Sequence, residues 1–146
     1  MKKMLFSLIL MLAMTTNAQA FCYAEAGKEY SVNPDLLKAI AYVESSWNNQ
    51  AINSNTNGSE DVCLMQVNSF WIRHLSDYGI TRQALLDDAC LCVKTGAYIL
   101  AYEISSVGQS WLAVGQYHRG PNGPRSKKND YAEKVYSVYL RLQAGN

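Results

Sequence analysis

The sequence predicts a mainly α-helical domain over residues 21–146, and three observations support this fold class. Apolar residues recur at helical spacing in most segments after Asn33. No repeat or low-complexity linker interrupts the stretch, whose length suits one domain. Cysteines 22, 63, 90 and 92 all lie within it, and an even number of cysteines in an exported chain favours two disulfides over a metal site.

Residues 1–20 have the composition of a secretory signal peptide. Lys2 and Lys3 form a basic start, an apolar run follows over residues 4–14, and Ala18-Gln19-Ala20 has the small-x-small pattern of a cleavage site. The apolar run is short for a membrane span, and no later stretch approaches the roughly 20 apolar residues that a spanning helix needs. We therefore expect an exported chain that begins near Phe21 without stable membrane insertion; an uncleaved N-terminal anchor is the less favoured alternative.

Capping residues and turn signals define the first helix and the loop after it. Asn33-Pro34 places a capping side chain before a proline in the first turn, which predicts a helix running to about Ser46. Residues 48–61 are polar and rich in asparagine, and Asn57-Gly58 is a turn signal, so we expect a loop there. Residues 64–67 are too few to assign.

The C-terminal half is predicted to contain five further helices. Asp87 or Asp88 is expected to cap the longest of them, and Gly108 to close it. Residues 120–124 form a breaker cluster, and we interpret the basic stretch 119–128 around it as a solvated loop. The predicted helices begin near Asn68 or Ser69, after Thr81, at Ala89 (running to about Ser105), at Ser110 (buried, running to Tyr117) and near Asp130 (running to about Leu142).

The charge balance argues against nucleic acid as a main partner. Lys2 and Lys3 fall in the signal segment, so the rest of the chain has a net charge near −1 (13 Lys plus Arg less these two, against 12 Asp plus Glu). Phosphate binding relies on a basic surface, which such a chain lacks. No metal is expected either, because Cys90-x-Cys92 is too tight for a zinc knuckle and the two histidines lie far from the cysteines in sequence.

One acidic residue stands out on the helix that follows Asn33. Leu37, Ile40, Ala41 and Glu44 follow the i, i+3, i+4, i+7 pattern, so Glu44 shares an apolar face and lies in the last turn. Partial burial and the negative end of the helix dipole both oppose ionisation of its carboxyl group. A neutral carboxylic acid is the proton donor that glycosidic bond cleavage needs. The alternative is a glutamate at the edge of the stripe that reaches solvent or pairs with an arginine.

Four segments carry a family resemblance, in the right order, over nearly all of residues 21–146. Residues 23–47 resemble the opening of the soluble lytic transglycosylase catalytic domain, and Glu44-Ser45 matches its catalytic Glu-Ser pair. Leu64-Met65-Gln66 resembles its Gly-Leu-Met-Gln motif. Residues 113–120 resemble its Ala-x-x-x-Tyr-Asn-Ala-Gly motif, and residues 131–136 its closing Tyr-x-x-x-Val-Tyr segment. The asparagine-rich loop is similar to that of small single-domain members associated with type III and type IV secretion, conjugation and pilus systems.

The resemblance implies a lysozyme-like fold with a glycan-binding cleft, a periplasmic location and peptidoglycan glycan strands as substrate. Glu44 is then expected to protonate the oxygen between N-acetylmuramic acid and N-acetylglucosamine. It would next act as base on the muramic 6-hydroxyl, which closes a 1,6-anhydro ring without water. One carboxylate serves both steps, unlike the two-carboxylate scheme of most glycosidases. No cofactor is implied, and components of a secretion, conjugation or pilus apparatus are the further expected partners.

The resemblance also implies supporting roles around Glu44. One residue would orient the carboxyl group, two would line the cleft next to the scissile bond, and two tyrosines would place hydroxyl groups near Glu44 or the sugar. For each of them the alternative is an ordinary structural role, such as core filling by methionine. The expected substrate-binding residues are Ser45, Met65, Gln66, Tyr117, His118 and Tyr131.

The chain departs from the family pattern at three positions. Cys63 stands where the family usually has glycine, and His118-Arg119 replaces Asn-Ala. The asparagine commonly contacts substrate, so His118 either keeps a polar contact with different pH behaviour or loses it. Cys92 is an additional cysteine. Related small members resemble this chain in cysteines near its start and at Cys90, which implies a Cys22–Cys90 disulfide and leaves Cys63–Cys92 as the second.

Two other functions stay open at the level of sequence. A hydrolytic lysozyme of the same fold would need a second carboxylate, for which Asp61 and Glu60 are the candidates. An inactive glycan-binding protein that docks a secretion apparatus to the wall is the second alternative. The intact Glu44 argues against this docking role, while the departures at Cys63 and His118 keep it open.

Overall fold

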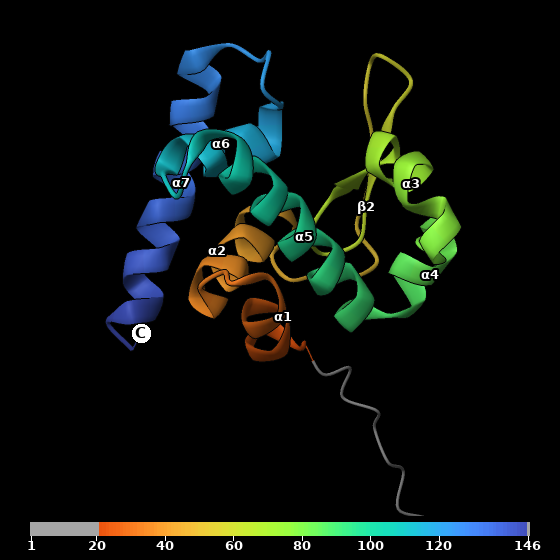
Figure 1. Ribbon diagram of the computed structural model, residues 1–146, viewed down its shortest axis with the longest axis horizontal. Coiled ribbons are helices and arrows are strands. Elements are labelled where there is room, and N and C mark those ends of the chain that lie inside the picture. Colours follow the sequence, from red (N-terminus) through yellow and green to blue (C-terminus); the bar gives the residue numbers. More distant parts are fainter. Residues whose placement is uncertain (1–20, 146) are drawn as a thin grey trace, which may run out of the picture.

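Within residues 21–145, which the computed structural model describes, helices account for most of the chain, and a small sheet and connecting loops make up the rest (Figure 1). The mainly α-helical prediction is confirmed, while the predicted signal segment 1–20 lies outside the described residues. The elements are, in chain order, α1 (Tyr23–Tyr30), α2 (Pro34–Ser45), β1 (Ile52–Ser54), β2 (Glu60–Val62), β3 (Val67–Asn68), α3 (Ser69–Leu75), the 3-10 helix η1 (Ser76–Tyr78), α4 (Arg82–Asp87), α5 (Ala89–Val107), α6 (Trp111–Arg119) and α7 (Arg125–Gln143).

Helix α5 is the central element of the fold. It runs between two groups of elements, with α1, α2, α6 and α7 on one side and the sheet with α3 and α4 on the other (Figure 1). Its buried face combines small and branched residues, and it packs against α1, α2, α4, α6 and β3. Because one helix joins both groups, the hydrophobic core is continuous from one to the other.

Side-chain caps fix where most of the predicted helices begin. Asn33 accepts a hydrogen bond from the Asp35 amide at 2.8 Å, and Asn68 caps α3 in the same way. Thr81 caps α4, and the Asp88 carboxylate accepts from the Leu91 amide at the start of α5. These bonds satisfy backbone donors that a helix start leaves unpaired, so the caps expected from the sequence are confirmed.

The sheet replaces part of the expected loop. β1 and β2 are antiparallel and pair Ile52 with Val62, and β2 pairs with β3 through Asp61 and Asn68. Only residues 55–59 form the connection between β1 and β2. Periodicity could not reveal these strands, because each is only two or three residues long and β1 is exposed throughout.

The basic stretch 119–128 is not a solvated loop throughout. α7 begins at Arg125, earlier than the sequence predicted, with Pro124 before its first turn. Lys128 is only 5% exposed, and its ammonium group donates to the Pro121 carbonyl oxygen. The helix starts early because proline can precede a helix without losing a needed backbone donor.

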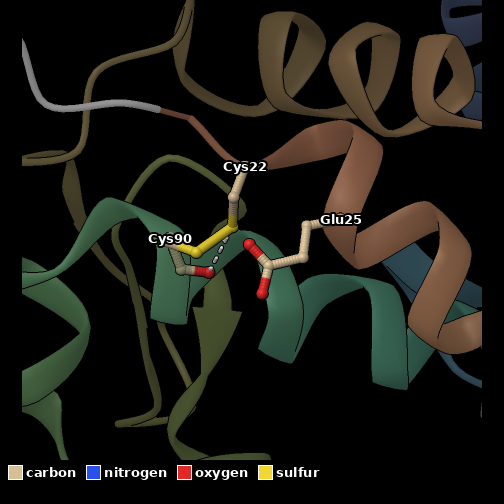
Figure 2. Close-up of side chains that lie close together, drawn as sticks. All are labelled: Cys22, Glu25 and Cys90. Atoms are coloured by element: carbon tan, nitrogen blue, oxygen red, sulfur yellow. Dashed lines mark hydrogen bonds between the residues drawn. A yellow bond between two sulfur atoms is a disulfide. The ribbon is translucent and has the colours of Figure 1, made fainter.

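Two disulfides tie distant segments to the start of α5. Figure 2 shows Cys22, at the start of α1, joined to Cys90, and the second bridge joins Cys63 to Cys92. Both implied pairings are confirmed. Glu25 lies beside the first bridge (Figure 2), but the two sulfur atoms are bonded to each other and its carboxylate pairs with Lys94 at 2.6 Å. This group therefore offers no thiolate ligands to a metal.

None of the helices in the described part of the chain combines the length and the apolar character that crossing a membrane would require.

Candidate active site

Helix α2 places Glu44 at the edge of the core. Leu37, Ile40 and Ala41 are fully buried, and the Glu44 side chain one turn later is 11% exposed. The predicted stripe therefore exists, with the carboxyl group at its open end. The helix ends at Ser45, and the left-handed backbone of its cap residue Ser46 lets the amides of Ser46 and Trp47 bond back to the carbonyl oxygens of Tyr42 and Ala41.

Ser45 fixes the end of α2 rather than the carboxyl group of its neighbour. Its hydroxyl group donates to the Leu64 carbonyl oxygen at 2.8 Å and accepts from the Asn48 amide. The expected hydrogen bond to Glu44 is not formed, because adjacent helical side chains point in directions about 100° apart. Ser45 instead ties α2 to the turn that follows β2.

Glu44 has two described side chains close to its carboxyl group. The Tyr131 hydroxyl group, on α7, donates to Glu44 Oε1 at 2.6 Å. His118, on α6, places Nδ1 3.7 Å from the same oxygen and stacks on the Tyr131 ring with a centroid distance of 4.4 Å. Side chains from α6 and α7, which follow each other in the chain, thus meet the carboxyl group of the distant helix α2.

The Tyr131 hydroxyl group is a donor that stays protonated. Its burial, and next the nearby Glu44 charge, raise the pKa of Tyr131 well above its ordinary value. The phenol therefore remains a hydrogen-bond donor across neutral pH. Because Oε1 accepts this bond, the proton of a neutral Glu44 carboxyl group lies on Oε2.

The turn from Cys63 to Gln66 forms the floor beside Glu44. Both end residues adopt left-handed backbone angles, with φ of 63° at Cys63 and 50° at Gln66. Glycine adopts such angles without strain, which explains why the family usually has glycine where Cys63 stands. Here the Cys63–Cys92 disulfide fixes the turn in place.

Within this turn, Gln66 lines the cleft and Met65 does not. The side-chain oxygen of Gln66 accepts a hydrogen bond from the Asn53 side chain on β1, and its side-chain nitrogen donates to the Cys63 carbonyl oxygen. These bonds hold the Gln66 side chain across the hairpin, where it lines the cleft. Met65 is fully buried and packs against Gly96 on α5, so the expectation that its side chain lines the cleft is corrected to core filling. Its carbonyl oxygen accepts a 2.7 Å hydrogen bond from the Tyr117 hydroxyl group.

These side chains surround a cleft of about 510 Å³ between the two groups of elements. This volume suits a ligand of several rings, since small-molecule sites span roughly 300–1,000 Å³. The hairpin, the start of α3, the middle of α5 and the end of α6 form its walls. The cleft residues among those predicted are Glu44, Gln66, Tyr117 and His118.

The two candidate second carboxylates lie in different environments. Asp61, on β2, lines the cleft and accepts hydrogen bonds from the amide groups of Asn55 and Asn68. Glu60 pairs with Arg82 at 2.7 Å, and this ion pair lowers the pKa of its carboxyl group. Only Asp61 therefore faces the space where a glycan would lie.

Two polar residues in the cleft wall were not predicted from the sequence. Glu103 on α5 is 4% exposed and Gln116 on α6 is 6% exposed, and both line the cleft. Glu103 lies one helical turn after the buried Ile99. This is the same signal that singled out Glu44, a carboxyl group on the apolar stripe of a helix.

The fold and the site together define a family. The family model named "Transglycosylase SLT domain" matches residues 21–139, and the chain belongs to this family. Its class is therefore that of the peptidoglycan lytic transglycosylases.

The chain is also similar in sequence to individual proteins. The chain is 38% identical over 141 residues to the protein IpgF of Shigella flexneri, a match that covers 95% of this chain and 92% of that protein. It is 38% identical over 139 residues to the invasion protein IagB of Salmonella typhimurium, covering 94% of this chain and 87% of the relative.

A solved structure agrees on the fold. An inactive mutant of the lytic transglycosylase Slt from Pseudomonas aeruginosa superposes with a TM-score of 0.65 and 19% identity, over 90% of this chain and 25% of that one. The lysozyme-like, mostly helical fold implied by the sequence is thereby confirmed.

Proposed function

We propose that this chain cleaves the β-1,4 bond between N-acetylmuramic acid and N-acetylglucosamine in peptidoglycan, with Glu44 as acid and then base. The hydrogen bond from the buried Tyr131 hydroxyl group to Oε1 of Glu44, which lines the cleft, is the observation that carries the proposal. It leaves Oε2 as the oxygen that exchanges a proton with substrate.

In the first step the Glu44 proton moves to the glycosidic oxygen. The bond from the muramic C1 to that oxygen breaks, and N-acetylglucosamine leaves with a free 4-hydroxyl group. Protonation is needed because an alkoxide is a poor leaving group. The Tyr131 hydroxyl group then stabilises the carboxylate that remains, since a hydrogen bond to a charged acceptor is stronger than one to a neutral acceptor.

In the second step the same carboxylate acts as a base. It takes the proton of the muramic 6-hydroxyl group while that oxygen bonds to C1, which closes the 1,6-anhydro ring. Glu44 returns to its neutral form, and no water is consumed. The described side chains that hydrogen-bond to the Glu44 carboxyl group or lie at ion-pair distance from it, Tyr131 and His118, are not carboxylic acids.

The direct test is the mass of the muropeptides released from purified sacculi. Anhydromuramic ends, lighter by one water than hydrolysis products, are expected from the wild-type chain and not from Glu44→Gln. Glu133→Gln, on the exposed face of α7, is the matched control and should leave the products unchanged.

A hydrolytic lysozyme is the second candidate, because Asp61 lines the same cleft as Glu44. Reducing-end products that disappear in Asp61→Asn would favour it. No products from either the wild-type chain or the variants would favour a docking role at the wall.

We further infer that the chain is exported and acts beside a secretion, conjugation or pilus apparatus. Two disulfides support an oxidising compartment such as the periplasm. The relative named invasion protein IagB supports a link to a system that crosses the envelope. Co-purification of the crosslinked chain with components of such an apparatus tests this role.

A further inference from the structure

A second acidic residue, Glu103, lies buried in the wall of the cleft. Its carboxyl group makes no hydrogen bond to any described residue, and desolvation raises its pKa. Lys128 is the opposite charge that acts on it, but the Lys128 ammonium group donates to the Pro121 carbonyl oxygen instead. Buried carboxyl groups are normally hydrogen-bonded, because leaving one unpaired is costly. Glu103 therefore lacks a partner that the cleft has room to hold.

Gln116, on the neighbouring helix α6, also has a side-chain oxygen without a described hydrogen-bond donor. Its side chain is 6% exposed and lines the cleft, and its Oε1 atom is buried without a hydrogen-bond partner among the described residues. The two positions lie on helices α5 and α6, which pack against each other, and both side chains line the same cleft. Glu103 and Gln116 both offer oxygen acceptors without a described donor, although only the Gln116 oxygen is fully buried. A group that pairs with both must be a hydrogen-bond donor.

The wall next to these acceptors is apolar. Ile99 precedes Glu103 by one turn on the same face of α5, is 2% exposed and also lines the cleft. Trp71 lines it from α3 and packs edge-on against Tyr102 of α5 at 5.2 Å. A ligand group that fits here must combine a donor with a small apolar surface. The acetamido group of an N-acetyl sugar has both, an N–H and a methyl group, whereas a hydroxyl group has only the donor.

We propose that Glu103 and Gln116 form a subsite that recognises the N-acetyl group of a sugar. Their oxygen atoms accept a hydrogen bond from the amide N–H, and the methyl group packs against Ile99. The carboxyl group of Glu103 offers an acceptor oxygen in either protonation state. A site built around buried acceptors also rejects an analogue that lacks the donor, since the acceptors then stay unpaired. This inference rests on the proposed function in taking a glycan as the ligand, and it names the substituent that the cleft recognises.

Binding of two sugar hexamers tests the subsite without requiring turnover. The probes are the hexamer of N-acetylglucosamine and the hexamer of glucosamine, measured by calorimetry on chains that carry Glu44→Gln. Glu103→Leu and Gln116→Leu are each expected to weaken binding of the acetylated hexamer about tenfold, the effect of one lost buried hydrogen bond. Glu103→Gln keeps an acceptor and should stay within about threefold of the parent. Glu133→Leu, exposed on α7, should bind like the parent.

Thermal unfolding separates a lost contact from a damaged fold. Replacing an unpaired buried carboxyl group by leucine should keep or raise the melting temperature while binding falls. Unchanged binding in both leucine variants would overturn the subsite, as would an absence of hexamer binding by the parent. So would a preference for the glucosamine hexamer that Glu103→Leu abolishes, because the site would then bind a cation.

The hexamers also separate this inference from the proposed function. They carry no peptide, so a defect seen only with intact sacculi would assign Glu103 to the stem peptide and overturn the N-acetyl subsite. If sacculi yield no anhydromuramic ends while the leucine variants still lose the acetylated hexamer, the proposed function fails and the subsite stands.

Discussion

The hydrogen bond between Tyr131 and Glu44 is the contact from which the proposed chemistry follows. It occupies one carboxyl oxygen and leaves the other for proton transfer. It also offers a stabilising donor whenever Glu44 is ionised, in the interval between the two steps. A hydrogen bond to a charged group contributes about 1.5–3 kcal/mol, which corresponds to roughly 10- to 150-fold in rate if it is made only at that stage.

Tyr131→Phe should therefore lower kcat for sacculus digestion about 10- to 100-fold and change KM little. The ring and its stacking on His118 are kept, so the melting temperature should shift by only a few degrees. Tyr136→Phe, half exposed on the same helix, is the control and should retain full activity. An unchanged kcat in Tyr131→Phe would contradict the role given to the phenol.

The stability of the chain is expected to depend on pH through Glu103. Burial raises its pKa in the folded chain above the ordinary value of 4.5, so the folded state holds this proton to a higher pH than the unfolded state does. The contribution of Glu103 to stability therefore falls as the pH rises above about 4.5. The free energy of unfolding of Glu103→Leu, compared with that of the wild type, should therefore be larger at pH 7 than at pH 4, which means that the variant gains relative stability at the higher pH. Denaturant titrations at both values check this, and a difference that does not vary with pH would refute it.

At the scale of elements, the contact between α5 and the turn 63–66 sets the position of the cleft floor. Gly96 lets Met65 approach the α5 backbone, and a Cβ atom added there would lie 2.6 Å from Met65 Cε and 2.9 Å from Met65 Cβ. Because Met65 Cβ is fixed to the backbone, the turn itself would have to move. Gln66 lines the cleft from this turn, so packing in the core is coupled to the site.

Gly96→Ala should lower the free energy of unfolding by about 1–3 kcal/mol, as overpacking of a core does. It should also reduce activity, because the displaced turn carries Gln66. Ser105→Ala, exposed on the same helix, should stay within about 0.5 kcal/mol of the wild type. Urea denaturation with sacculus digestion measures both effects, and full stability of Gly96→Ala would show that the turn adapts freely.

The elements that sequence predicted correctly have strong local signals. Asn33-Pro34 marked the start of α2, and Asp88 and Gly108 marked the ends of α5. α1 lacks such a signal, because Cys22 at its start makes no side-chain cap. The hairpin was not predicted because its strands are too short to show an alternation of apolar and polar residues, and their pairing across a turn leaves no such pattern.

The candidate site likewise contains residues that local sequence patterns predict and residues that they do not. The stripe on α2 predicted that Glu44 lies at the edge of the core, since its neighbours are only one turn away. Tyr131 lies 87 residues further on, so its bond to Glu44 depends on how α7 packs against α2. The family motif, rather than periodicity, pointed to that residue. Motif resemblance also misled where geometry decides, because Ser45 bonds Leu64 and Met65 is buried.

At the scale of the whole molecule, the two disulfides hold both groups of elements to the first turn of α5. Cys22–Cys90 attaches α1, and Cys63–Cys92 attaches the turn that forms the cleft floor. The second bridge closes a loop of 29 residues, for which chain entropy suggests a stabilisation of about 3–4 kcal/mol.

The double variant Cys63→Gly with Cys92→Ala should lose about 3 kcal/mol of unfolding free energy and keep its cleavage activity at low temperature. Glycine takes the left-handed backbone of Cys63 without strain, so the turn keeps its shape. The matched pair Cys63→Ala with Cys92→Ala should be about 1 kcal/mol less stable again, because alanine disfavours that backbone. Equal stability of the two double variants would show that backbone strain at residue 63 is unimportant.

The central claim is that Glu44 serves both steps and that water does not take part. Digestion of sacculi in water enriched in oxygen-18 tests this claim most directly, read by the mass of each new muramic end. The account predicts anhydromuramic ends that carry no label in the wild-type chain. Reducing ends that each carry one labelled oxygen would contradict it, because a water molecule would then have attacked the anomeric carbon.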